Sequence, residues 1–558
     1  MSDAAPPGAG DRKRDGAAAE LLRLCAVLVL SAWPAVVGIV SPHDLELHDQ
    51  GKQAMYVVGA LQGDWLVPHD RGDVASKPPL YTWLAALGGA AFGLSEVTVR
   101  LPSVLAMLVL GFATYAVGRR LLDPTAALVG VALLATLQHL TKLVFFARTD
   151  MLLSAFVALA LLAWVVRRDV AFWVCVGLAT LTKGPAGLAI PLAAVAIDLA
   201  VRRDLAGLRA LRPLRGLAIV AGLAALWLLP AFVLHPGEMR QMFELHLLDQ
   251  LTNTGIHEGA KSQPFWYLVA YYGVKLLPWA LLLPVAFRRH GRPSDPAFLL
   301  VAWIVGGLFV FLFPPNKRPD HLLPMYAPGA LLAGAVIADW LRGAVPAASA
   351  RALDLGARGW ALAASAFALL ALPAAWLGLV HTTVSPPLWV FGASLLALLP
   401  LRGALRARAE PRARVAAAVV AQALLGLAWA QTFSAPAQES RAIDLRRFVA
   451  EAERVAPASD LVLCQVRSWT APFLLQRNDP PISFAELPRL VADATPRWVV
   501  MPESIWATWS TDPAAFGGQP APPVTARSAE GRPPERDDLV LVRVGGEGGD
   551  AGAAEVVM

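Results

Sequence analysis

The residues best suited to chemistry lie in one loop that follows the first apolar run. Between His43 and Pro79 the sequence gathers carboxylates, histidines and lysines beside segments of high hydropathy. Ionisable side chains next to a membrane usually mark a site rather than a scaffold. Asp49 could activate or orient a hydroxyl group, and Lys77, held extended by the prolines that follow it, could hold an anion such as phosphate.

Four later segments, 147–151, 181–187, 235–264 and 313–321, carry polar residues of the same kinds. Lys183, Lys317 and Arg318 are further candidates for binding a phosphate, because lysine supplies a point charge and arginine a two-pronged donor. Asp150 could pair with Arg148 or with one of these cations, as a structural or a functional ion pair.

Three aromatic residues lie close to these segments in sequence. Tyr81, Trp83 and Tyr326 either line a lipid or sugar pocket or belong to the aromatic belt that membrane interfaces display. The residue types alone leave both explanations open.

The charged candidates also have simpler explanations. Asp49 could cap the helix expected at 50–61, which would not exclude catalysis. Lys77 could be a lysine at the membrane interface whose ammonium group extends into water, and Lys183 could be an ordinary charged residue in a turn. Lys317 and Arg318 fit such explanations less well, because positive charge is scarce in the other short turns on their predicted side of the membrane. This exception favours a function for the pair.

Composition indicates a membrane protein. Of 558 residues 56% are hydrophobic and 16% charged, and the mean hydropathy is +0.53. The net charge of +6 comes from short basic clusters between apolar runs, which fits the positive-inside rule better than nucleic-acid binding. The three cysteines lie far apart, so neither a disulfide framework nor a thiolate metal site is indicated.

The basic clusters predict the topology. The first cluster, 12–14, is placed on the cytoplasmic side. If two spans separate each cluster from the next, all later clusters fall on that side too. The resulting thirteen spans are 21–41, 97–118, 124–142, 150–166, 169–182, 185–201, 214–235, 264–287, 296–313, 322–341, 358–380, 386–402 and 414–432. The run 80–94 is too short to cross comfortably and is expected to be an interfacial or re-entrant helix.

We therefore predict an all-α polytopic membrane protein with a small C-terminal α/β domain. Residues 1–20 form a flexible cytoplasmic N-terminus, 21–433 the membrane domain with a first extracytoplasmic loop at 42–96, and 434–545 an extracytoplasmic domain. The run from 21 could be a signal peptide, but its length and the many later spans favour a retained helix. Strand-like runs at 460–466, 497–501 and 538–544 indicate the α/β domain, and 546–558 reads as a disordered tail.

An ordered series of motifs then resembles a known family. The series is DQGKQA at 49–54, GDWLVP at 63–68, SKPPLYTW at 76–83, VRLPSVL at 99–105, RTDMLL at 148–153, LTKGPAGL at 181–188, PFWYL at 264–268, LPW at 277–279 and the residues of 316–328. It resembles the GT-C glycosyltransferases that use polyprenyl-phosphate sugars, a group that includes lipid A aminoarabinose transferases and protein O-mannosyltransferases. The aminoarabinose branch, also described by thirteen spans and an extracytoplasmic C-terminal domain, is the most similar.

The resemblance implies an inverting membrane enzyme. It would move a sugar from polyprenyl phosphate, such as undecaprenyl phosphate, to a lipid A-like glycolipid, a polysaccharide or a protein outside the cytoplasmic face of a bacterial inner membrane. Asp49 matches the acidic residue that opens the family's first-loop motif. A donor that already carries its leaving group needs no nucleotide cofactor, and no G-x-G-x-x-G loop stands out. A flippase or transporter of lipid-linked sugars, or a noncatalytic lipid-carrier-binding protein, is the alternative.

A divalent metal is an open question. In the aminoarabinose branch an acidic residue before the KPP lysine and a histidine from a later loop are implicated in metal binding, but this chain has Ser76 at the acidic position. The remaining candidates are Asp70, Asp73, His246 and His257. Their types suit Zn²⁺ or Mg²⁺, but their spacing does not specify a site. Ser76 also argues against naming aminoarabinose as the sugar.

Overall fold

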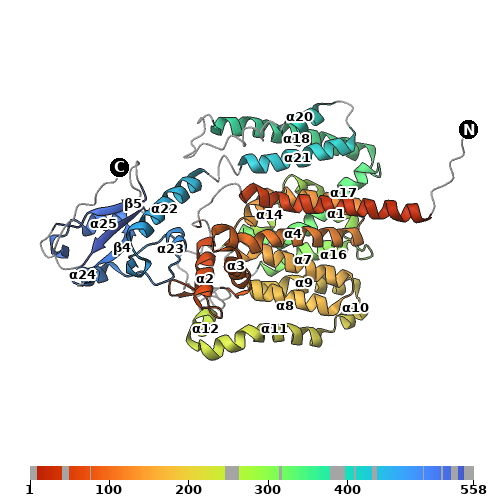
Figure 1. Cartoon of the computed structure of the whole chain (residues 1–558). Helices are drawn as coiled ribbons and strands as arrows, with labels where there is room; N and C mark the ends of the chain where they lie inside the picture. Colours follow the sequence, from red (N-terminus) through yellow and green to blue (C-terminus); the bar gives the residue numbers. More distant parts are fainter. Residues whose placement is uncertain are drawn as a thin grey trace, which may run out of the picture.

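The chain folds into a bundle of helices with a small sheet domain at one end, as the computed structural model in Figure 1 shows. The structure describes residues 9–39, 45, 49–75, 77–244, 263–312, 317–376, 396, 398–406, 410–429, 436–493, 495–516, 520–529 and 538–545. Ser76, His246, His257, most of the predicted span 386–402 and the predicted tail lie outside these residues.

The bundle is built from long apolar helices and two bent pairs of shorter ones. The long helices are α1 (Ala9–Ile39), α4 (Glu96–Leu121), α7 (Thr149–Val165), α8 (Asp169–Lys183), α9 (Pro185–Arg202), α11 (Pro213–Leu234), α16 (Phe298–Val310), α17 (Leu323–Leu341), α18 (Ala347–Trp376) and α21 (Pro411–Trp429). The bent pairs are α5 (Pro124–Ala135) with α6 (Gln138–Val144), and α14 (Tyr267–Lys275) with η2 (Trp279–Leu282) and α15 (Leu283–His290).

Among the described residues, six helices are long and apolar enough to cross a membrane, or up to eight if each bent pair is one span. The bends are 69° in the first pair and 104° in the second. Every predicted span contains helix, although for 386–402 only the end is described, in α20 (Leu398–Leu405). The chain is thus a mostly helical membrane protein.

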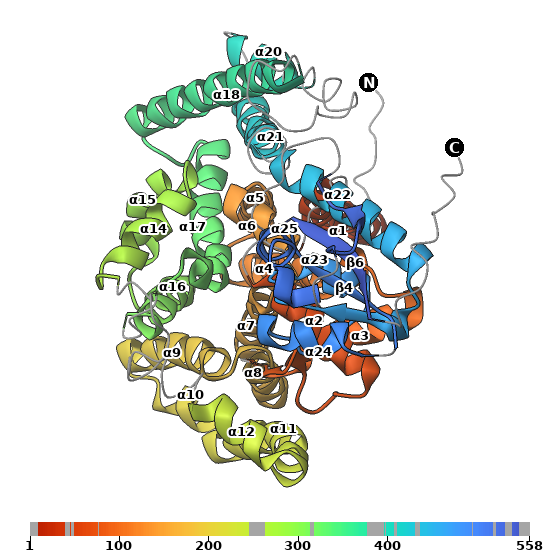
Figure 2. The ribbon, with the colours of Figure 1, turned by 90° about the vertical axis from the view of Figure 1, so that its left-hand side faces the viewer.

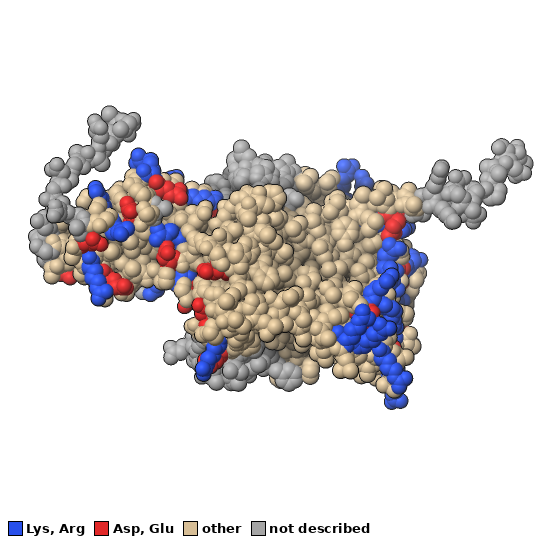
Figure 3. Space-filling view, turned by 60° about the horizontal axis from the view of Figure 1, so that its bottom comes forward, with Lys and Arg blue, Asp and Glu red and all other residues tan. Residues whose placement is uncertain are grey.

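Basic side chains gather at one end of the bundle. Arg342, after α17, donates to Asp123 at the start of α5 (2.8 Å), and Arg119 at the end of α4 pairs with Glu20 of α1. Figure 3 shows this basic end, the mixed charges of the C-terminal domain at the opposite end, and a broad surface with few charges between them. Such an apolar band between two polar ends is the surface that a bilayer requires.

The first loop contains two helices and a hairpin at the end away from the basic clusters. They are α2 (Gln50–Gln62), β1 (His69–Asp70), β2 (Asp73–Val74) and α3 (Leu80–Phe92). Arg71 and Gly72 form the two-residue hairpin turn, with φ of 51° and 96°. Positive φ at both turn positions matches the twist of a tight hairpin.

The C-terminal domain is a four-stranded mixed sheet covered on both faces. The strands are β3 (Leu461–Leu463), β4 (Arg497–Pro502), β5 (Val524–Arg527) and β6 (Leu539–Val544), in the order β3-β4-β6-β5, with only β3 and β4 parallel. In β6, Leu539 and Leu541 pack towards α22 (Pro436–Val455), whereas Val540 and Val542 pack towards α25 (Glu503–Trp509). Burial on both faces explains why the first four residues of this strand, 539–542, are all apolar. The three predicted strands are confirmed; β5, a short VTAR run, was not predicted.

Candidate functional site

Asp49 lies immediately before α2, but its carboxylate does not cap that helix. Its backbone carbonyl accepts from the amide of Gln53 (3.2 Å), and the side chain makes no capping hydrogen bond. Asp49 Oδ2 instead faces three cations: Arg318 at 2.9 Å, Lys77 at 3.6 Å and Arg148 at 3.9 Å. The structure therefore brings the first-loop carboxylate together with a lysine of the same loop and with arginines from two later segments.

Buried amide groups fix the start of α2. Gln50 Oε1 accepts from the Arg100 side chain of α4 and from the Ala147 backbone amide, both at 3.3 Å. One turn on, Gln53 donates to Thr82 Oγ1 of α3 (2.7 Å). Both glutamines are almost completely buried, so these bonds are protected from competition with water. They set the position of Asp49 relative to Arg148.

Arg148 is the centre of the cluster. Only 4% of its side chain is exposed, and it contacts Asp49, Asp150 (3.2 Å) and Asp320. Asp150 also pairs with Lys183, at the end of α8. The predicted pairing of Asp150 thus involves both Arg148 and a candidate phosphate-binding cation. Arg318 and Lys77 lie at the outer side of the cluster, with 47% and 23% of their side chains exposed.

Sequence reasoning did not single out two members of this network, Asp320 and His139. The imidazole of His139 lies between Asp320 Oδ1 (3.0 Å) and the hydroxyl of Tyr326 (2.7 Å). Tyr326 is fully buried on α17, where it stacks on Tyr272. Asp320 lies in the motif that also contains Lys317 and Arg318, so that motif was a usable signal. His139 lies inside a predicted span, in the run QHLTK, and belongs to none of the motifs.

Tyr81 is placed behind the site rather than in it. It is fully buried, and its hydroxyl contacts the Val99 carbonyl (3.1 Å) and Ser103 Oγ (3.0 Å). Ser103 in turn donates to the carbonyls of Phe146 (2.7 Å) and Arg148 (3.3 Å). Tyr81 therefore supports the backbone that carries Arg148.

We expect Tyr81→Phe to destabilise the chain by about 1 kcal/mol, since it deletes one buried hydrogen-bonding group and leaves its partners in place. The activity should fall only modestly, because no charge is lost. Thermal unfolding of the purified protein in detergent, measured beside a transfer assay, checks this. Parent-like stability would show that the hydroxyl does not hold the Arg148 turn.

The remaining candidates have hydrogen-bond partners of their own or lie at the surface. The Lys317 ammonium donates to the carbonyl of Gln263 (3.1 Å), and the Trp83 indole to the carbonyl of Trp65 (2.7 Å). Asp70 accepts from Arg71 Nε (3.0 Å) and from the Trp469 indole (2.9 Å). Asp73 is exposed in the hairpin.

No group of three or more His, Cys, Asp or Glu side chains in the described part of the chain is arranged to hold a metal. Both later-loop histidines fall outside it, so the metal hypothesis stays a prediction.

Electrostatics hold Asp49 in its ionised form. Burial raises the pKa of Asp49, but the charges of Lys77, Arg318 and Arg148 outweigh this effect and keep the pKa below its usual value. Burial lowers the pKa of Lys77, and Lys183 and Arg148 lower it further, while Asp49 opposes the shift. Because neighbouring cations disfavour the charged form of Lys77, an anion that binds beside it would stabilise that form.

The cluster has an excess of positive charge. Its cations are Lys77, Arg148, Lys183 and Arg318, and its carboxylates are Asp49, Asp150 and Asp320. Four cations against three carboxylates leave one positive charge in excess among these ion-paired groups, and Lys142 adds to the positive charge near Asp320. Such an excess suits an anion such as a phosphodiester. The arrangement can bind a phosphate group while keeping a carboxylate beside it.

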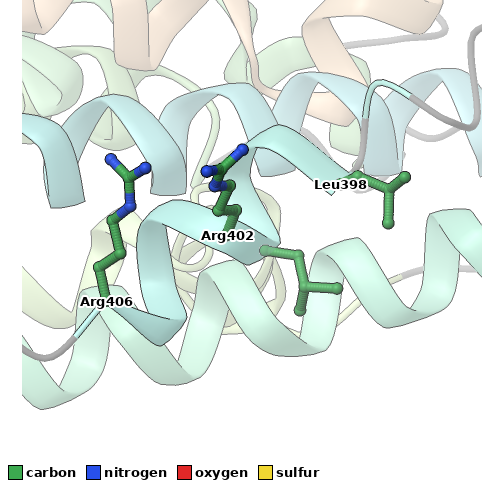
Figure 4. A pocket seen from close by; sticks show the side chains of 4 residues that line it. Leu398, Arg402 and Arg406 are labelled. Carbon is green, nitrogen blue, oxygen red and sulfur yellow. The ribbon is translucent and has the colours of Figure 1, made fainter.

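A separate pocket lies far along the chain from these residues. Leu398, Leu401, Arg402 and Arg406 line it, on and just after α20 (Figure 4). None of the network residues contributes to this pocket.

The fold and the charged cluster define a polytopic membrane protein with a network of cations and carboxylates at one end. Residues 76–229 match the family described as dolichyl-phosphate-mannose-protein mannosyltransferase. These residues include Lys77, Arg148, Asp150 and Lys183.

Curated relatives extend the match. The undecaprenyl phosphate-alpha-4-amino-4-deoxy-L-arabinose arabinosyl transferase of Pseudomonas aeruginosa PAO1 is 30% identical over 367 residues, which cover 62% of this chain and 66% of the relative. The enzyme of the same name from Pseudomonas paraeruginosa is 31% identical over 60% of this chain and 62% of its own. The chain thus spans just under two thirds of the length of these relatives.

The fold has a counterpart among solved structures. The crystal structure of ArnT from Cupriavidus metallidurans bound to undecaprenyl phosphate superposes with a TM-score of 0.73 over 94% of this chain and 97% of ArnT, at 20% identity. Because the identity is low, this likeness concerns the fold. The sequence matches and this fold likeness together make the chain similar to glycosyltransferases that use polyprenyl-phosphate sugars.

Proposed function

We propose that this chain is a glycosyltransferase that moves a sugar from a polyprenyl-phosphate donor to an acceptor at the membrane surface. The observation that carries the proposal is the contact of one carboxylate, Asp49, with three cations in a cluster that has one positive charge in excess. Sugar transfer from a lipid phosphate needs both components, cations for the departing phosphate and a polar group for the acceptor.

The cations divide naturally by burial. Arg318 and Lys77 are partly exposed, so their ion pairs with Asp49 are weak and can be exchanged for contacts with a phosphate. Arg148 and Lys183 are held by Asp150 and Asp320, which keeps their charge in a fixed position. Lys317, next to Arg318, is retained as a candidate donor-binding residue on sequence grounds.

The reaction follows from these placements. The acceptor oxygen attacks the anomeric carbon, the bond from that carbon to the phosphate oxygen breaks, and polyprenyl phosphate leaves with the electron pair. Lys77 and Arg318 turn from Asp49 to the phosphate and stabilise its growing charge. Asp49, released from these ion pairs, becomes more basic and can accept or orient the proton of an acceptor hydroxyl. Attack opposite the leaving group inverts the configuration.

The names of the relatives indicate which substrates to test first. Undecaprenyl-phosphate aminoarabinose is the first donor, and a lipid A glycolipid is the first acceptor; polysaccharide and protein acceptors follow. A flippase would be expected to place ionisable residues along a path at mid-membrane depth. The concentration of this network at one end of the bundle supports transfer instead.

We also propose thirteen spans, a cytoplasmic N-terminus and a catalytic face in the periplasm of a bacterial inner membrane. The boundaries are those expected from the sequence, 21–433 for the membrane domain and 434–545 for the periplasmic domain. The basic end of the bundle supports this orientation, because arginine and lysine favour the cytoplasmic side.

The depressed pKa of Lys77 gives a pH test. As pH rises through that pKa, Lys77 loses its proton and the KM for the donor should increase. In Lys77→Arg the guanidinium stays protonated, so the alkaline rise in KM should move to higher pH, whatever the change in kcat. Lys52→Arg, at an exposed position of α2, is the matched control and should leave the profile in place. An unshifted profile in Lys77→Arg would remove Lys77 from donor binding.

A direct experiment tests the proposal. The purified chain in lipid vesicles is given labelled undecaprenyl-phosphate aminoarabinose and lipid A, and both lipids are analysed by mass spectrometry. A mass increase of lipid A with release of undecaprenyl phosphate is expected. If no sugar leaves this donor, other polyprenyl-phosphate sugars are tested in the same assay, and failure with all of them contradicts the proposed function.

A further inference from the structure

The C-terminal domain packs directly on the helix that follows Asp49. Figure 1 shows α23 (Thr470–Leu474) beside α2, and Figure 2, viewed from the side of the C-terminal domain, shows the domain in front of α2 and α3. The contacts run along the whole of α2. Thr470 Oγ1 accepts from the amide of Leu45 (3.1 Å) before the helix begins, and the carbonyl of Gln476 accepts from Gln62 (2.8 Å) where it ends.

Two glycines form the face of α2 that receives this domain. A Cβ added at Gly51 would lie 2.3 to 2.6 Å from side-chain atoms of Trp469, and one at Gly59 would lie 2.7 Å from Asn478 Nδ2. The spacing of eight residues places both on one side of the helix, about 12 Å apart. Glycine at both positions therefore allows the domain to approach the α2 backbone closely.

The first-loop hairpin holds Trp469 in place on Gly51. The Trp469 indole N–H donates to Asp70 Oδ2 (2.9 Å), and the Arg71 guanidinium lies over the Trp469 ring at 5.7 Å. Arg71 also donates to the carbonyls of Val466 (2.8 Å) and Ser468 (3.1 Å). The turn that gives Arg71 its left-handed conformation thus directs its side chain into the C-terminal domain.

The opposite side of α2 contacts the membrane domain through Gln50 and Gln53. Its first turn is therefore held between the two domains, with Asp49 one residue before it. Trp469 presses on the helix at Gly51, two positions after Asp49. A shift of this turn would change the distances from Asp49 to Lys77, Arg148 and Arg318 together.

We propose that the C-terminal domain is a positioning element for Asp49, acting through Trp469 on Gly51. The inference rests on the proposed glycosyltransferase function. It assigns Asp70 a role as the anchor of Trp469, and it makes Trp469 a positioning residue that touches no substrate.

Gly51→Ala tests the proposal, because the new methyl group must displace either α2 or Trp469. A displacement near 1 Å can cost about 100-fold in rate, so we expect kcat to fall by about 10- to 100-fold. The affinity for undecaprenyl phosphate should change little. Gly222→Ala is the matched control: Gly222 lies within α11, and a Cβ there meets nothing within 4 Å. It should behave as the parent.

A double-mutant cycle separates positioning from a general structural defect. If Trp469 and Gly51 act through Asp49, Gly51→Ala should cause no further loss of kcat in an Asp49→Asn background. Equal losses in both backgrounds would overturn the proposal. If Asp49→Asn itself transfers sugar at the parent rate, the proposed role of Asp49 fails first, which is a distinguishable result.

Trp469→Phe and Trp469→Leu cover the case in which Gly51→Ala does not fold. Phenylalanine keeps a ring against Gly51 and loses only the indole N–H that donates to Asp70. Because the loss of one hydrogen bond typically corresponds to about a fivefold effect, kcat should fall by at most about fivefold. Leucine removes the ring and should lower kcat further while undecaprenyl phosphate still binds. Equal activity of the parent and Trp469→Leu would contradict the proposal.

Discussion

Asp49→Asn is expected to lower kcat by about 10²- to 10⁴-fold, the range for loss of a positioned acid or base. The substitution keeps the size of the side chain but removes the charge that faces Lys77, Arg148 and Arg318. These cations then lack a competing carboxylate. Undecaprenyl phosphate should therefore bind at least as tightly as to the parent, so that turnover and lipid affinity change in opposite directions.

Asp64→Asn is the control for this experiment. Asp64 belongs to the same loop, half of its side chain is exposed, and its ion-pair partner is His69 at 3.7 Å. The variant should retain parent activity, since exposed pairs of this kind contribute little. Transfer by Asp49→Asn at the parent rate would exclude Asp49 as the catalytic carboxylate. Loss of lipid binding together with turnover would assign Asp49 to site structure instead.

Arg148→Leu should have the largest effect on stability and should also abolish transfer. Arg148 is almost completely buried and contacts three carboxylates. Removing one partner of a buried ion pair costs about 3–5 kcal/mol, because the other charge stays buried without compensation. Lys183 and His139 still face Asp150 and Asp320, so the lower end of this range is expected. The thermal unfolding midpoint and the transfer rate are the measurements.

Two further variants separate the effect of Arg148→Leu on stability from its effect on sugar transfer. Adding Asp320→Asn to Arg148→Leu removes a buried charge and should recover part of the stability, but no activity. Arg215→Leu is the surface comparison: half of the Arg215 side chain is exposed, and its contact with Asp169 is 3.4 Å, so less than about 1 kcal/mol is expected. Recovery of transfer in the Arg148→Leu, Asp320→Asn variant would show that Arg148 serves only to neutralise Asp320.

The sequence predicted the class of fold from physical features that act locally. Apolar runs of sufficient length indicate membrane-spanning helices, so the helices of the bundle were expected. The basic clusters between the runs indicate which end of each helix faces the cytoplasm. The C-terminal strands were recognisable as short apolar runs separated by Pro, Asn and Asp clusters. The strand β5 (Val524–Arg527) was missed because four residues carry too weak a pattern.

The site was predictable in part. Asp49, Lys77, Arg148, Asp150, Lys183 and Arg318 were candidates by residue type and motif, and the structure brings them into one network. The pairing within that network depends on how separate helices meet, which no local pattern contains. His139 illustrates the limit, since it becomes meaningful only when α17 places Tyr326 beside it. The support of α2 by Trp469 likewise depends on packing between residues more than 400 positions apart.

The most direct test of the account compares the parent and Asp49→Asn in vesicles that contain labelled polyprenyl-phosphate sugar and lipid A. We expect the parent to release polyprenyl phosphate in step with acceptor labelling. Asp49→Asn should bind the lipid carrier but transfer the sugar at least about 100-fold more slowly. Equal transfer by the two proteins, or lipid binding by the parent without consumption of any polyprenyl-phosphate sugar, would contradict the account.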